Sequence, residues 1–102
     1  MSQKVALVTG AAAGIGAAIC RRLARDGIAV GVLDINLDDA TKVATEIVSQ
    51  GGKAIPLQAS VADRIQVNAA VVRLRAEFGP VTIVVNNAGI TGWVPFEEID
   101  DA

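Results

Sequence analysis

The sequence contains no histidine, no tyrosine and only one cysteine among its 102 residues. The lack of histidine argues against the usual zinc sites, and a single cysteine, Cys20, excludes an internal disulfide bond. Cys20 falls within a predicted helix, where we expect a small buried residue and not a reactive thiol. Without tyrosine, these residues offer no phenol group as a proton donor or acceptor.

Basic clusters and long apolar runs are absent as well. The formal net charge is −2, from 9 Lys and Arg against 11 Asp and Glu, which argues against nucleic acid as a partner. The first apolar run, Val5 to Val8, is too short for a signal peptide or a membrane span, so we expect a cytoplasmic protein with no membrane partner. With 52% hydrophobic and 20% charged residues, the chain is typical of one globular domain.

A glycine-punctuated segment follows that first apolar run. Val5 to Val8 shows no polar alternation, which predicts a strand buried on both faces, as in a parallel sheet. Gly10, Gly14 and Gly16 then fall where the chain must turn sharply from this strand into a helix. Free N–H groups and the positive dipole end of that helix favour a phosphate. The segment predicts a pyrophosphate site, although an ordinary glycine-rich turn would show the same three glycines.

The rest of the chain alternates between apolar runs and helical patterns. Its expected elements are strands at 28–34, 54–59 and 81–85 and helices at 14–26, 36–49 and 63–78. Asn36 is the expected N-cap of the second helix, and either Ser60 or Asp63 is that of the third. Pro56 cannot donate to a strand ladder, so the third strand should lie at a sheet edge. This order predicts a parallel sheet covered by helices, with ligands at the carboxyl ends of the strands.

The first two predicted helices each carry apolar residues at helical spacing. The expected core residues of the first helix are Ile15, Ala18, Ile19 and Leu23. Those of the second helix are Ala40, Val43, Ala44, Ile47 and Val48. We expect both sets to pack against the sheet.

Asp34 ends the second predicted strand, at the same edge of the sheet as the glycine segment. A carboxylate there can accept two hydrogen bonds from the diol of an adenosine ribose. It would also repel a 2′-phosphate, and no Lys or Arg lies within several residues to offset that repulsion. The residue therefore favours NAD over NADP, although a solvated aspartate at a strand end is the simpler alternative.

Two motifs resemble the short-chain dehydrogenase/reductase family. Residues 9–16, Thr-Gly-Ala-Ala-Ala-Gly-Ile-Gly, match the family's TGxxxGxG loop, and residues 86–89, Asn-Asn-Ala-Gly, match its NNAG motif. Their order and separation also fit, and the resemblance covers essentially the whole chain. It implies a Rossmann-type, three-layer α/β fold with parallel sheet order 3-2-1-4, a nicotinamide cofactor, and the interconversion of secondary alcohols and ketones.

The resemblance further implies roles for individual residues in cofactor binding. Those expected to line the pyrophosphate are Gly10, Gly14, Ile15 and Gly16. The adenosine ribose is expected at Asp34 and Ile35, and the nicotinamide end at Asn87, Ala88 and Gly89. Family members commonly carry an acid beside the adenine where this chain has Ser60, just before Val61. A serine can still form a weaker hydrogen bond there.

Two further departures concern cofactor preference and catalysis. Members that use NADP often carry Arg or Lys at the position of Ala13, so Ala13 and Asp34 together favour NAD. The family's catalytic serine, tyrosine and lysine are expected beyond residue 102, and no lysine of this chain is placed to substitute. We therefore expect residues 1–102 to be the cofactor-binding half of a longer enzyme, truncated after the fourth strand and inactive alone.

Two other functions stay open at this point. One is a non-catalytic module that binds NAD or associates with itself. The other is a domain that binds S-adenosylmethionine, which also uses a glycine loop and an acid, although residues 86–89 argue against it. The predicted strand 81–85 is uncharged and β-branched, and an unpaired strand edge is a template for another chain. We expect self-association through this strand.

Overall fold

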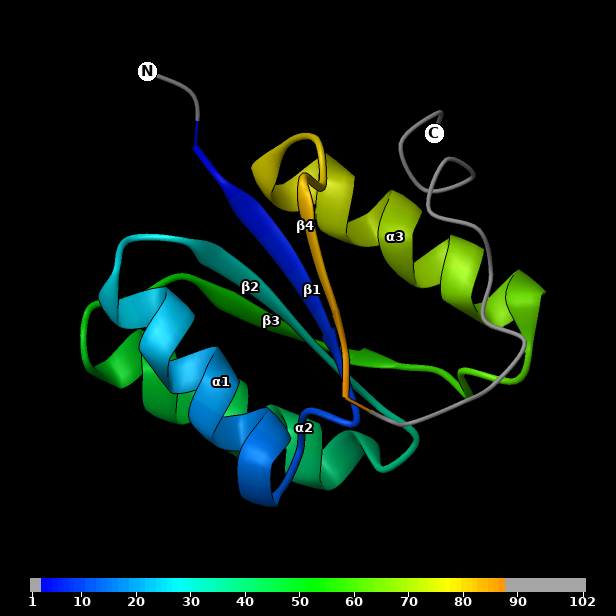
Figure 1. Ribbon diagram of the computed structural model, residues 1–102, viewed down its shortest axis with the longest axis horizontal. Helices are drawn as coiled ribbons and strands as arrows, with labels where there is room; N and C mark the ends of the chain where they lie inside the picture. Colours follow the sequence, from blue (N-terminus) through cyan, green and yellow to red (C-terminus); the bar gives the residue numbers. More distant parts are fainter. Residues whose placement is uncertain (1–2, 88–102) are drawn as a thin grey trace.

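Four parallel strands and three helices alternate along the chain (Figure 1). The structure is a computed structural model, and it describes residues 3–87. The strands are β1 (Val5–Thr9), β2 (Ala29–Asp34), β3 (Ala54–Gln58) and β4 (Ile83–Asn86). The helices are α1 (Gly14–Arg25), α2 (Leu37–Ser49) and α3 (Arg64–Phe78). The strand order is β3-β2-β1-β4 with every pair parallel, which confirms the predicted fold class.

Helices cover both faces of the sheet, so the fold has three layers. α1 and α2 lie on one face and α3 lies on the other (Figure 1). Successive side chains of a strand point to opposite faces. Leu7 therefore packs with Leu33 and Leu74 on the α3 side, whereas Val8 packs on the side of α1 and α2. Because both of its faces are covered, β1 is buried at every position.

The two outer strands follow the prediction with one change of boundary. β3 pairs only with β2 within residues 3–87, and Pro56 lies in it, as expected of an edge strand. β4 begins at Ile83, later than the predicted 81–85. The N–H of Thr82 nevertheless donates to the carbonyl of Val5 at 3.0 Å, so pairing with β1 starts just before the strand itself.

Side chains cap the second and third helices. The Asn36 side chain accepts from the N–H of Asp39 at 3.1 Å, which confirms it as the N-cap of α2. Of the two candidates for α3, Asp63 is the cap, since its Oδ1 accepts from Ile65 and Gln66 at 3.0 and 3.2 Å. Both helices therefore begin with backbone donors already satisfied.

The expected apolar face of α1 is confirmed only in part, since Ile19 and Leu23 pack against the core as partly buried residues. The buried residues of α1 are Gly16, Ala17 and Cys20, whereas Ile15 is 73% exposed and Ala18 is exposed as well. The buried positions of α1 are held by small residues, and at Gly16 there is no room for a Cβ beside the Gly10 carbonyl oxygen.

Val48 was expected in the core of α2, and that prediction is also wrong. Its side chain is 53% exposed, although Ala40, Val43, Ala44 and Ile47 are buried as predicted. Val48 is one helical step beyond Ile47, which places it at the rim of the buried stripe, where it lines a surface groove with Ala44 and Pro56.

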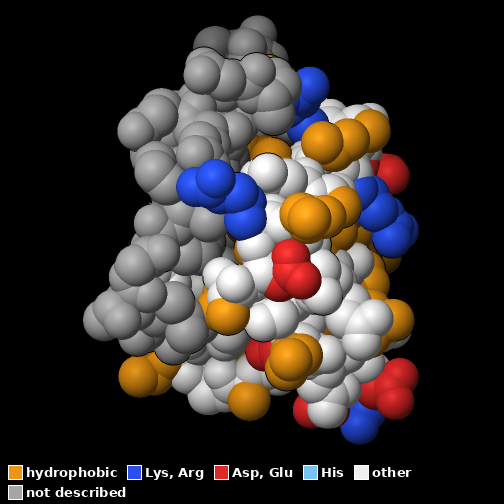
Figure 2. All heavy atoms as spheres, turned by 90° about the vertical axis from the view of Figure 1, so that its right-hand side faces the viewer, with side chains coloured by type: hydrophobic (Ala, Val, Ile, Leu, Met, Phe, Trp, Pro, Cys, Tyr) orange, Lys and Arg blue, Asp and Glu red, His pale blue; other side chains and the backbone are white. Residues whose placement is uncertain are grey.

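The surface shown in Figure 2 carries a mixture of hydrophobic and charged side chains. Hydrophobic groups on this face lie in separate small clusters, with Lys, Arg, Asp and Glu side chains between them. Two large apolar residues of α3, Ile65 and Val72, are 81% and 56% exposed. Within residues 3–87, no helix has both the length and the apolar character that a membrane crossing requires.

Candidate functional site

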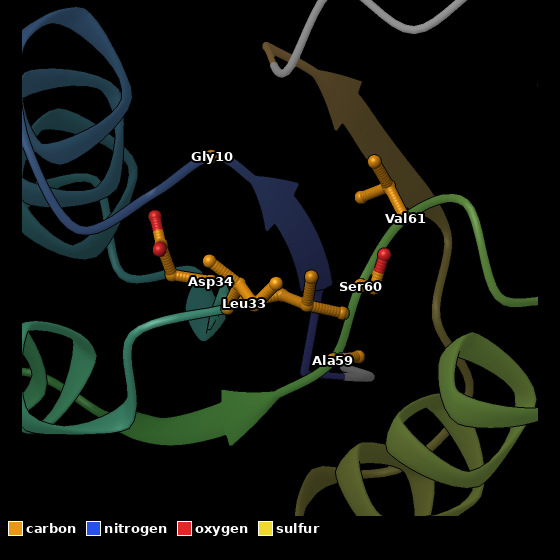
Figure 3. Close-up of a pocket in the computed structure, with 7 residues that line it drawn as sticks. Gly10, Leu33, Asp34, Ala59, Ser60 and Val61 are labelled. Atoms are coloured by element: carbon orange, nitrogen blue, oxygen red, sulfur yellow. The ribbon is translucent and has the colours of Figure 1, made fainter.

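The segments that follow the first three strands surround a cavity of about 190 Å³ at the carboxyl edge of the sheet (Figure 3). Its lining residues are Gly10, Leu33, Asp34, Ile35, Ala59, Ser60 and Val61. Five of these were expected at a cofactor from the sequence. Leu33 and Ala59 were not, although each directly precedes a predicted site residue or pair. The carboxyl edge of a parallel sheet is where such folds bind their ligands.

The glycine loop between β1 and α1 depends on close backbone packing. Gly10 and Gly14 have φ of +59° and +57°, in the left-handed region that favours glycine. Gly16 has a different role, because a Cβ there would overlap the Gly10 carbonyl oxygen and lie 2.8 Å from the Asn87 Nδ2. Only a residue without a side chain lets α1 approach the loop this closely.

Hydrogen bonds from two strands hold the loop in place. The N–H of Ala11 donates to the carbonyl of Leu33 in β2 at 3.1 Å. The Asn87 Nδ2, just after β4, donates to the carbonyl of Gly10 at 3.1 Å. In the same region the buried Thr9 hydroxyl lies 3.1 Å from the Asn86 Oδ1, to which it donates. The TGxxxGxG and Asn-Asn segments are thus in direct contact, far apart as they are in sequence.

The start of α1 differs from the starts of the other two helices. Its N-cap residue, Ala13, makes no side-chain cap, whereas Asn36 and Asp63 cap α2 and α3. The first turn of α1 contains no acid, as in α3 but unlike α2. The first N–H groups of a helix have no partner within the helix, and the dipole adds a partial positive charge there. The end of α1 that faces the loop is therefore suited to an anionic group.

Asp34 lines the cavity and contacts the backbone with both of its carboxylate oxygens. Its Oδ2 accepts from the N–H of Ala12 at 3.1 Å, and its Oδ1 accepts from the N–H of Asn36 at 3.0 Å. In Figure 3 the carboxylate points towards the loop that leaves Gly10. Each oxygen can accept more than one hydrogen bond, so the group keeps acceptor capacity for a ligand hydroxyl. Neither Lys nor Arg lines the cavity.

The segment after β3 forms the far wall of the cavity. The N–H of Ala59 donates to the carbonyl of Asp34 at 3.2 Å, which holds this segment beside β2. The N–H of Ser60 donates to the Gln66 side chain at 2.8 Å, and the Ser60 hydroxyl accepts from Ala62 at 3.3 Å. Val61 and Ile35 add apolar surface, and Ile35 is 68% exposed.

Some predicted site residues lie apart from this cavity. Gly14, Ile15 and Gly16 belong to the first turn of α1 and do not line it, and Asn87 contacts the loop from the β4 side. Ala88 and Gly89 lie outside the described residues.

Cys20 takes no part in the site. It is fully buried in α1, and burial raises the pKa of its thiol to about 12. The thiol therefore stays protonated at neutral pH, as expected of a packing residue and not of a nucleophile.

Comparisons with known proteins agree on one family. A family profile described as "short chain dehydrogenase" matches residues 4–102. Cyclohexanol dehydrogenase of Acinetobacter sp. is 46% identical over 91% of this chain and 37% of its own length. D-threitol dehydrogenase of Mycolicibacterium smegmatis is 42% identical over 94% of this chain and 37% of its own length.

Solved structures give the same result. A 3-ketoacyl-ACP reductase from Sinorhizobium meliloti matches 92% of this chain and 37% of its own, with a TM-score of 0.81 and 48% identity. A metagenomic short-chain oxidoreductase in complex with NADP matches 88% of this chain and 41% of its own, with a TM-score of 0.79 and 36% identity. This chain spans 14% to 42% of the length of the curated relatives it matches.

Proposed function

The chain belongs to the short-chain dehydrogenase family, and we propose that it supplies the NAD-binding part of an oxidoreductase that interconverts a secondary alcohol and a ketone. The cavity at the carboxyl ends of β1, β2 and β3, next to the uncapped start of α1, carries this proposal. The names of two relatives, cyclohexanol dehydrogenase and D-threitol dehydrogenase, support alcohols as substrates.

The proposed arrangement divides the cofactor among three groups of residues. The glycine loop and the first turn of α1 bind the pyrophosphate through backbone N–H groups, with Gly10, Gly14, Ile15 and Gly16. Asp34 and Ile35 bind the adenosine ribose, and Ser60 and Val61 lie at the adenine. The nicotinamide end is assigned to Asn87 and, from the sequence motif alone, to Ala88 and Gly89. When bound, the nicotinamide accepts or donates the hydride.

NAD is the preferred cofactor in this proposal because of charge at the ribose. The Asp34 carboxylate lies at the cavity wall, and a 2′-phosphate placed beside it would meet a like charge. Neither Lys nor Arg lines the cavity to neutralise such a phosphate. One similar solved structure holds NADP, so the preference depends on this chain's own residues and not on the family.

A titration of the 102-residue chain with NAD and with NADP tests the preference. We expect the affinity for NAD to be the higher of the two, and the double variant Asp34→Ser with Ile35→Arg to reverse that order. Equal or tighter binding of NADP by the unmodified chain would contradict the proposal. S-adenosylmethionine serves as the control ligand, and we expect no binding.

We also propose self-association through β4. Within residues 3–87, β4 pairs only with β1, and no described strand pairs with its other edge. Ile83, Val84 and Val85 in this strand are all only half-buried. An apolar, unpaired edge of this kind pairs readily with a second copy.

A further inference from the structure

Three hydrogen bonds attach the glycine loop to the residues around it, and in one of them the acceptor is a charged side chain. Ala11 is bound to the backbone of Leu33, and Gly10 is bound by the amide of Asn87. The third bond joins the N–H of Ala12 to the Asp34 Oδ2 at 3.1 Å. Asp34 is therefore attached to the loop before any ligand is considered.

A carboxylate is the side chain that this geometry requires. Both partners of Asp34, the N–H of Ala12 and the N–H of Asn36, are donors, and each contacts a different oxygen. An asparagine has one acceptor oxygen and one NH₂ group, so it can accept from one partner only. Its NH₂ would face the other donor, and one of the two backbone groups would lose its bond.

We propose that Asp34 is a positioning residue for the glycine loop, which its carboxylate holds in the bent form that presents backbone N–H groups to a phosphate. This inference rests on the proposed function and adds a second role to the same carboxylate. A ribose diol that binds at Asp34 then also binds the group that orders the neighbouring loop. Substitutions at position 34 should therefore weaken the pyrophosphate site for NAD and NADP alike, besides changing the choice between them.

Amide hydrogen exchange in the ligand-free 102-residue chain tests the positioning role directly. In Asp34→Ala, which removes both acceptor oxygens, we expect the Ala12 amide to exchange about tenfold faster or more, since hydrogen bonds to charged groups are strong. The amide of Ala11 should change much less, because its acceptor is the Leu33 backbone. Asp38→Ala is the matched control, since Asp38 is exposed near the start of α2. An unchanged Ala12 rate in Asp34→Ala would overturn the proposal.

The unmodified chain supplies a second measurement that does not depend on the folding of a variant. The Ala12 amide should be protected relative to that of Ala13, for which the described residues offer no hydrogen-bond partner. Equal exchange of the two amides would overturn the positioning role.

Inorganic pyrophosphate separates positioning from simple charge effects. Removal of a negative charge beside the loop should by itself tighten pyrophosphate binding, and Asp38→Ala measures an effect of that kind. If Asp34 positions the loop, Asp34→Ala should instead bind pyrophosphate several-fold more weakly. Tighter binding in Asp34→Ala would overturn the proposal. Failure of the unmodified chain to bind pyrophosphate or NAD would count against the proposed function, while Ala12 exchange would still decide the role of Asp34.

Discussion

Gly16 is the residue at which the loop and the first helix depend most directly on each other. A methyl group at this position would overlap the Gly10 carbonyl oxygen and crowd the Asn87 amide. The contact with the Gly10 carbonyl oxygen cannot be relieved by rotating a side chain, because it involves the backbone. The loop or the helix must therefore move if the residue changes.

We expect Gly16→Ala to destabilise the chain by about 1–3 kcal/mol, as overpacking does, and to displace the loop. Gly14→Ala is the matched control. Its φ of +57° makes alanine unfavourable by about 1–2 kcal/mol, but no atom lies within 4 Å of the added Cβ. Urea unfolding measures both losses of stability. Amide shifts of Gly10 and Asn87 should change strongly in Gly16→Ala only, and similar shifts in both variants would contradict the packing argument.

Among the helices, α1 begins without the side-chain cap that Asn36 and Asp63 provide for α2 and α3. An N-cap stabilises a helix by satisfying its first donors. At α1, however, the same donors are those proposed to bind phosphate. Stability of the helix and affinity for the cofactor should therefore respond in opposite directions to a cap at this position.

Ala13→Asp tests this opposition, because Ala13 already has the extended backbone of a cap residue. We expect the variant to be more stable by about 0.5–2 kcal/mol and to bind NAD more weakly, since the new carboxylate occupies the donors and repels phosphate. Asp63→Ala should lose a similar amount of stability with no change in NAD affinity. Thermal unfolding and an NAD titration measure the two effects. Tighter NAD binding by Ala13→Asp would contradict the phosphate site at α1.

At the scale of the whole molecule, the proposed self-association through β4 can be tested in solution. We expect sedimentation at tens of micromolar to show dimers or larger species of the unmodified chain. Thr82→Lys should weaken this association, because Thr82 is exposed beside the strand and a charge opposes edge pairing. Val84 is unsuitable for the same change, since it packs against the core on the α3 side.

Thr45→Lys adds the same charge at an exposed position of α2 and serves as the control. It should leave the association unchanged. A single monomer species of the unmodified chain, or equal effects of the two lysines, would show that β4 is not the contact.

The last prediction is that the 102-residue chain alone does not catalyse the reaction. The 102 residues contain no tyrosine, so the family's usual proton donor is missing. General acid–base catalysis typically contributes ~10²–10⁴-fold to a rate, and we expect no turnover of simple secondary alcohols. Formation of NADH that follows the purified, mass-verified chain would contradict this.

Local patterns in the sequence predicted a parallel sheet covered by helices, whereas the strand order came from the family resemblance. Buried parallel strands are apolar throughout, caps and turns need particular residues, and alternating strands and helices favour one right-handed topology. For these reasons the alternation of strands and helices, the Asn36 cap and the edge position of Pro56 agree with the structure. The order β3-β2-β1-β4 agrees with what the family resemblance implied. The same reasoning placed Asp34 and Ser60 at one edge, where they line one cavity.

Contacts between residues far apart in the sequence decided which residues of α1 are buried and which groups bond to Asp34, and the sequence pattern could not predict either. Periodicity places Ile15 on one face with Ile19 and Leu23, which do pack against the core, but Ile15 lies in the first turn of α1 and is exposed. No spacing rule indicates that Asp34 accepts from Ala12, because this bond exists only once β1 and β2 lie side by side. The reason is physical: local patterns record the preferences of single elements, whereas the orientation of a helix and the partners of a carboxylate are set by the backbone of other elements.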